Sequence, residues 1–289
     1  MHERKEREIL QYALTGKAPV LTPIEQETYD SYRKDILEKP NVEWYIPTSY
    51  PDRGIEMRYA GAQGDGLTLD EVTKLSGKAE AVIHILESHG LVCEDGVLTV
   101  AYDDKIKNQM EMRIVNLGYH LVIPRSGCAV PGQIEEQLSY GIPAYTMRNF
   151  NPDNRYTMKT LEEIVCRVVS VYILRTLKLP EKADAVLQNG GTPFISDSQD
   201  RLWERTGNTI EDVRSLAKVF KKADMVPFLQ LRDYVKPSES PEHRSLNIEA
   251  LRSNYPNSEA VQLLCNIAAR IESDSDDLAD YMMSDPFPD

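Results

Sequence analysis

Residues 67–104 have the sequence LTLDEVTKLSGKAEAVIHILESHGLVCEDGVLTVAYDD. The apolar spacing before Gly90 predicts two short helices separated at Gly77, because glycine is a poor residue for a helix interior. The alternation in VLTVAY, residues 97–102, follows turn residues at 94–96 and predicts a β-hairpin. The segment is therefore expected to form two helices followed by a hairpin.

The order and lengths of these elements resemble the winged-helix (winged helix-turn-helix) family, over residues 67–104 only. In that family the second helix reads the major groove of DNA with basic or polar side chains. Here eight acidic residues stand against two lysines, a net charge of −6, and phosphates repel such a surface. The resemblance therefore implies a unit that docks protein. The alternatives are a winged-helix transcription regulator that reads duplex DNA and a chance succession of helices and a hairpin.

Outside this segment, helical apolar spacing predominates. The predicted fold class is mainly α with a small β component (α+β), in which a winged-helix-like unit precedes a helical domain. We expect a helix at 105–117, a buried strand at 119–124, a short helix at 133–140 that ends at Gly141 and Pro143, and a long buried helix at 158–179. The predicted divisions are a helical arm and irregular segment at 1–66, the winged-helix-like unit at 67–124, a helical domain with a basic surface at 125–236, C-terminal helices at 237–270 and a disordered acidic tail at 271–289.

Composition limits the class of protein. The 41% apolar content supplies a core, and without a long apolar run or a signal-peptide pattern we expect a cytoplasmic or nuclear protein that is not secreted and has no membrane partner. Four cysteines and the histidines His84, His89 and His120 match no metal-ligand spacing, so no metal and no cofactor are expected. The cysteines are expected to be free thiols.

Residues 140–159, YGIPAYTMRNFNPDNRYTMK, mix aromatic and basic residues in a way that suits single-stranded nucleic acid, because rings stack on bases and cations follow phosphates. Residues 201–236 carry eight basic and five acidic residues, a local excess of +3. The candidate nucleic-acid-binding residues are Tyr145, Arg148, Arg155, Tyr156, Lys159, Arg214, Lys218, Lys221 and Lys222. The alternative is that the tyrosines pack in the core.

The last 19 residues, 271–289, contain seven acids and no base. Acidic residues that flank a few large apolar ones are typical of a disordered motif that folds on a partner. The alternative is an acidic tail that is only solvated. The candidate partner-binding residues are Leu278, Tyr281, Met282 and Phe287.

These features together predict a nucleic-acid-associated assembly or adaptor protein, with protein partners and a possible homo-oligomer, and without catalysis. The order of elements also has a looser similarity to the helical nucleoproteins of negative-strand RNA viruses. The enzyme alternative uses the loop 124–132, where a strand, a loop and a helix start could hold the phosphate of a nucleotide or nucleoside substrate. A parallel sheet that ends at this loop would favour that alternative.

Overall fold

The computed structural model describes residues 9, 12–13, 18–38, 55–61, 69–89, 96–103, 111–115, 118–124, 131–147, 156–189, 209–236 and 245–284. Within these ranges, the side chains of the strands and of several helix ends lie outside the description. The described chain is mostly helical, which confirms the mainly α prediction. It divides into two compact units, Met1–Ile83 with Val92–Leu138, and His84–Leu91 with Ser139–Asp289. The five-part division expected from the sequence stays a prediction.

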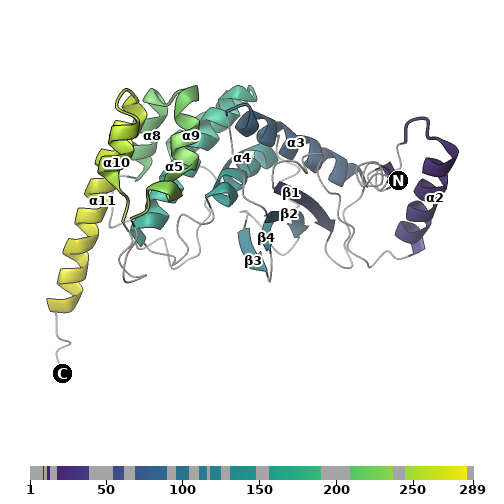
Figure 1. Ribbon diagram of the computed structural model, residues 1–289, viewed down its shortest axis with the longest axis horizontal. Helices are drawn as coiled ribbons and strands as arrows, with labels where there is room; N and C mark the ends of the chain where they lie inside the picture. Colours follow the sequence, from purple (N-terminus) through teal and green to yellow (C-terminus); the bar gives the residue numbers. More distant parts are fainter. Residues whose placement is uncertain are drawn as a thin grey trace. The chain divides into compact units, whose positions relative to one another are not determined.

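The first unit contains α2 (Pro23–Glu38), a four-stranded sheet and most of α3 (Leu69–Glu87). Its strands are β1 (Ile55–Gly61), β2 (Gly96–Asp103), β3 (Glu111–Val115) and β4 (Gly118–Pro124). The sheet order is β1-β2-β4-β3, in which β2 runs parallel to both β1 and β4, and β3 runs antiparallel to β4 (Figure 1). In the chain α3 connects β1 to β2, as parallel neighbours require a crossover.

The hairpin predicted at residues 94–102 is wrong. The alternating residues do form a strand, β2, but both of its edges pair in parallel with β1 and β4, which leaves no edge for an antiparallel wing. The helix predicted at 105–117 is also wrong where it is described, because residues 111–115 are β3 and pair with β4. Strand pairing has overridden the local preference of these residues.

The helix break predicted at Gly77 is wrong as well, because α3 is continuous from Leu69 to Glu87. Gly77 is exposed, and a Cβ added there would meet nothing within 4 Å. A glycine in a helix interior costs about 0.5–1 kcal/mol, and the burial of Leu75, Val82 and Leu86 outweighs that cost. Among the described residues of 67–104, neither the helical turn nor the hairpin that carried the winged-helix resemblance is present.

The helix predicted at 133–140 is too short. The expected stop at Gly141 and Pro143 does not occur, because α4 runs from Gln133 to Thr146 with Pro143 inside it. Its side chains are buried on nearly every face, including Leu138, Ile142 and Tyr145. Packing of this kind compensates for the backbone hydrogen bond that a proline removes.

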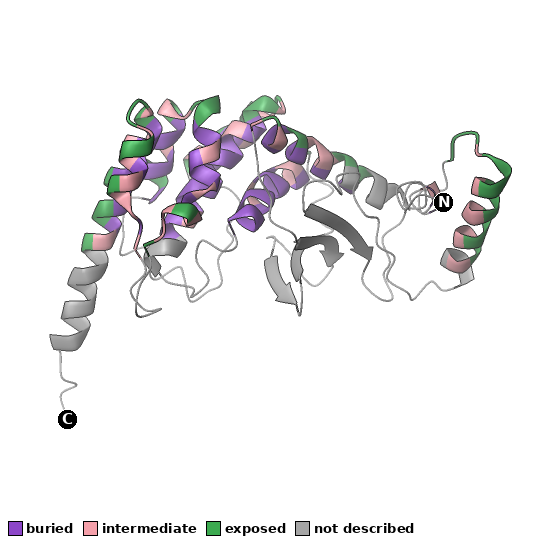
Figure 2. Ribbon diagram, in the orientation of Figure 1, coloured by how far each residue is buried: buried purple, intermediate pink, exposed green. Residues whose placement is uncertain are grey.

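The second unit is a helical assembly around α5 (Tyr156–Thr176). The predicted burial of this helix is confirmed, since Leu161, Val165 and Val169 are fully buried (Figure 2). It packs against α6 (Pro180–Asn189), α8 (Thr209–Val219) and α11 (Glu259–Ser284). The remaining elements are the short helices η3 (Lys222–Asp224), α9 (Met225–Leu229), η4 (Leu231–Tyr234) and α10 (Ile248–Asn254).

The disordered tail predicted from residue 271 is corrected by α11, which continues to Ser284. Its first half is anchored by buried residues, including Val261, Leu264 and Ile271. Because extending a helix is far easier than nucleating one, the anchored half allows the polar residues beyond it to remain helical.

Candidate functional site

The structure describes only some of the predicted nucleic-acid-binding residues. Tyr145 is fully buried in α4 and cannot stack on a base, so its assignment is wrong; the residue lies in a helix where a loop was expected. Arg148 and Arg155 lie outside the described residues. Tyr156 and Lys159 lie in the first turn of α5, but their side chains are not described.

Arg214 is committed to the fold. Its Nε donates to the carbonyl oxygen of Leu187 at 2.6 Å and its Nη2 donates to that of Gln188 at 3.1 Å. Its Nη1 forms an ion pair with Glu211. The guanidinium therefore satisfies the last carbonyls of α6, a usual role for a cation at a helix C-terminus, and we no longer assign it to nucleic acid.

Lys218, Lys221 and Lys222 are the predicted residues that remain available. All three are exposed, at the end of α8 and the start of η3. Within the part of the chain that the structure describes, no carboxylate forms a salt bridge with any of them. Three ammonium groups within five residues give this end of the helix a local positive charge.

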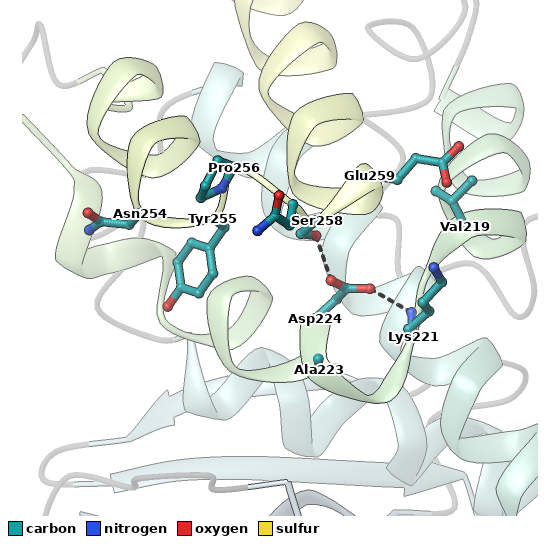
Figure 3. Close-up of a pocket in the computed structure, with 10 residues that line it drawn as sticks. Val219, Lys221, Ala223, Asp224, Asn254, Tyr255, Pro256, Ser258 and Glu259 are labelled. Atoms are coloured by element: carbon teal, nitrogen blue, oxygen red, sulfur yellow. Dashed lines mark hydrogen bonds between the residues drawn. The ribbon is translucent and has the colours of Figure 1, made fainter.

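One of these lysines, Lys221, lines a cavity of about 320 Å³ (Figure 3). Its lining comes from the α8–η3 connection on one side and from the α10–α11 connection on the other. Residues that matter to its chemistry are Lys221, Asp224, Asn254, Tyr255, Ser258 and Glu259.

Asp224 holds the two sides of the cavity together. It is 5% exposed, and its carboxylate accepts hydrogen bonds from the backbone N–H of Lys221 and from the hydroxyl of Ser258, both at 2.6 Å. The Ser258 oxygen also accepts from the N–H of Val261 at 3.0 Å and so caps α11. The negative charge of Asp224 is therefore directed into the fold.

Tyr255 supplies an aromatic wall. Its half-buried ring meets that of Tyr234 edge to face, with 6.4 Å between the ring centroids. The Tyr234 hydroxyl accepts a hydrogen bond from Asn254 at 3.0 Å. Burial raises the pKa of Tyr255 above its usual 10.0, and hydrogen bonding to Tyr234 adds to this, so the phenol is neutral at physiological pH.

The arrangement combines a cation, a neutral aromatic ring and an amide in one hollow. Such a combination binds a phosphate and a planar ring together. Glu259 opposes this, because its exposed carboxylate also lines the cavity. Sequence reasoning found the lysines but missed Tyr255 and Asp224, since Tyr255 lies in a short connection and the role of Asp224 depends on its contact with Ser258, 34 residues further along the chain.

Comparison with family models, curated proteins and solved structures found no match for this chain. In the described part of the chain, no helix is long and apolar enough to cross a membrane. No group of three His, Cys, Asp or Glu residues there is placed to hold a metal ion. The described cysteines, Cys166 and Cys265, are free thiols, as expected.

The predicted partner-binding residues fall into two groups. Leu278, Tyr281 and Met282 lie in the last turns of α11, and their side chains are not described. Phe287 lies outside the described residues.

Proposed function

We propose that this protein is a nucleic-acid-associated assembly protein that binds single-stranded nucleic acid at the cavity beside α8. The observation that carries the proposal is that Lys221 lines one cavity with Tyr255 and is within three residues of Lys218 and Lys222 in the chain, all three lysines being exposed and without salt bridges to described residues. Lys218, Lys221 and Lys222 would contact successive phosphates, and Tyr255 would stack on a base.

The expected strength follows from these contacts. A single strand loses affinity with salt at a slope of about −0.7 per phosphate contact, so three lysines contribute about −2 to the slope of log K against log salt. Stacking on one aromatic ring adds about 1–3 kcal/mol. The site therefore predicts modest, strongly salt-dependent binding with little sequence preference.

The experiment is a fluorescence anisotropy titration of labelled single-stranded RNA and DNA oligonucleotides. Lys221→Ala with Lys222→Ala should weaken binding, whereas Lys236→Ala, which removes an exposed lysine outside the cavity lining, should not. Tyr255→Phe keeps the ring and should bind like the parent, while Tyr255→Leu should bind less well. Equal affinities across the set would reject the site.

Arg148 and Arg155 remain part of the proposal on sequence grounds. The double variant Arg148→Ala, Arg155→Ala belongs in the same titration, because it tests the part of the proposal that rests on the sequence alone. A loss confined to this variant would move the nucleic-acid contact away from α8.

The parallel sheet favours a second candidate function, the binding of a nucleotide. Gly61, Asp103 and Pro124 are the last residues of the three parallel strands, and α4 begins nine residues after Pro124. Ligands of parallel sheets bind beyond the carboxyl ends of the strands. A titration with a fluorescent nucleoside triphosphate tests this: saturable binding weakened by Asp103→Asn supports it, and an absence of saturation dismisses it.

A further inference from the structure

The last turns of α11 are unusually acidic for the end of a helix. Asp274, Asp276, Asp277 and Asp280 lie within seven residues, with no basic residue between Arg270 and Ser284. Negative charge near a helix C-terminus is unfavourable because of the helix dipole, and like charges three or four residues apart repel. These turns are therefore expected to gain stability from a cationic surface.

The chain carries such a surface at the other end of the same helix. Glu259, the first residue of α11, lines the cavity beside Lys221. Figure 3 shows the start of α11 at this cavity. The lysines and the aspartates have opposite charge and similar number, three against four.

The aspartates cannot reach the lysines of their own chain. A helix rises about 1.5 Å per residue, so Asp274 and Asp280 lie about 22 and 32 Å along the axis from Glu259. α11 has no break over this distance. Contact between the two charged regions therefore requires a second copy.

We propose that the four aspartates of α11 in one copy dock on Lys218, Lys221 and Lys222 of a second copy. The contact joins different surfaces of the two chains, so it leaves a free lysine cluster at one end and a free acidic end at the other. Such head-to-tail contacts build rings or open chains. Leu278, Tyr281 and Met282, at helical positions i, i+3 and i+4, lie in the docking segment and add apolar contact area.

The same lysines then serve two anions. A nucleic-acid strand and the acidic end of a neighbouring copy compete for one lysine cluster. Binding of nucleic acid would therefore dissociate the self-associated copies. This competition rests on the function proposed above, whereas the self-association does not.

The experiment is sedimentation velocity over a concentration series of the full chain, at about 50 mM and about 500 mM salt, where the Debye lengths differ about threefold. Two charge-reversed proteins are compared with the parent. One carries Lys218→Glu, Lys221→Glu and Lys222→Glu, and the other carries Asp274→Lys, Asp276→Lys, Asp277→Lys and Asp280→Lys. Circular dichroism and thermal melting check that each is folded, and Lys236→Glu is the control for charge reversal elsewhere.

The parent and Lys236→Glu should associate at low salt and separate at high salt. Each charge-reversed protein alone should associate about tenfold or more weakly, because both of its surfaces then carry the same sign. An equimolar mixture of the two should associate again, since each acidic surface then meets a basic one. A folded pair that fails to associate when mixed overturns the proposal, as does undiminished association of either protein alone.

A single-stranded homopolymer added to the parent separates the two proposals. Dissociation of the copies when the homopolymer is added supports shared use of the lysines. If the mixture experiment succeeds and the homopolymer does not bind, the self-association stands and the nucleic-acid function fails.

Discussion

The carboxylate of Asp224 accepts a hydrogen bond from the hydroxyl of Ser258, 34 residues further along the chain, at 2.6 Å. This contact fixes the start of α11 against the end of α8, and it gives the cavity beside Lys221 its shape. The position of the proposed binding site therefore depends on a buried acid that would not itself touch a ligand.

Loss of this contact should destabilise the second unit. Asp224→Asn can accept only one of the two hydrogen bonds, and we expect a cost of about 1–3 kcal/mol in the free energy of unfolding. Ser258→Ala should cost a similar amount, because it leaves the Lys221 contact intact but removes both the bond to Asp224 and the cap of α11. Urea denaturation of both single variants and the double variant measures the coupling, expected at about 0.5–3 kcal/mol. Strict additivity would show that the two residues act independently.

Substitution of Gly77 tests whether α3 is continuous or interrupted at this residue. Because its position is exposed and open, Gly77→Ala should stabilise the protein by about 0.5–1 kcal/mol. Gly132→Ala is the matched control of opposite sign, since Gly132 has a φ of 74° and alanine there is strained. Thermal melting measures both. Destabilisation by Gly77→Ala would instead indicate that the helix is interrupted at Gly77.

Asp212 predicts a pH dependence of stability. Burial raises its pKa above the usual 3.8, against the lowering effect of the Arg270 guanidinium 2.5 Å away. The folded state thus binds this proton more tightly than the unfolded chain, so the stabilising contribution is complete below pH 3.8 and is lost as the pH rises through the raised pKa. In Asp212→Asn, the free energy of unfolding should no longer decrease as the pH rises through this range.

Arg270→Met provides the converse test. It removes the cation that lowers the pKa of Asp212, so this pKa should rise further. The loss of stability should therefore extend to higher pH than in the parent. If the profiles of Asp212→Asn and the parent have the same shape, Asp212 is not the group responsible.

Glu259 should weaken the proposed nucleic-acid contact, because its carboxylate shares the cavity with Lys221. Glu259→Gln should therefore tighten binding of a single-stranded oligonucleotide about twofold, the scale of an exposed charge interaction near 0.5 kcal/mol. Glu249→Gln is the matched control, an exposed acid in the first turn of α10 that does not line the cavity. Anisotropy titration compares them. Equal gains from both would indicate a general effect of net charge.

Sequence reasoning succeeded where a pattern determines structure locally. The apolar spacing of α5 predicts its burial, which the structure confirms. It failed where distant contacts decide. The pairing partners of β2 and the packing around Pro143 lie far along the chain, and no local pattern encodes them.

The candidate site shows the same division. Lys218, Lys221 and Lys222 are visible as a basic run, but the burial of Tyr145 and the capping role of Arg214 follow only from neighbours in space. Tyr255 enters the site because Asp224 and Ser258 bring its connection to α8. Charge could be predicted from composition, whereas the aromatic partner required the fold.

The salt dependence of oligonucleotide binding tests the central proposal most directly. The slope of log K against log salt is measured for the parent and for the triple variant Lys218→Ala, Lys221→Ala, Lys222→Ala. The proposal predicts a slope that is shallower by about 2 in the variant, because three phosphate contacts are lost. Identical slopes in the two proteins would contradict it.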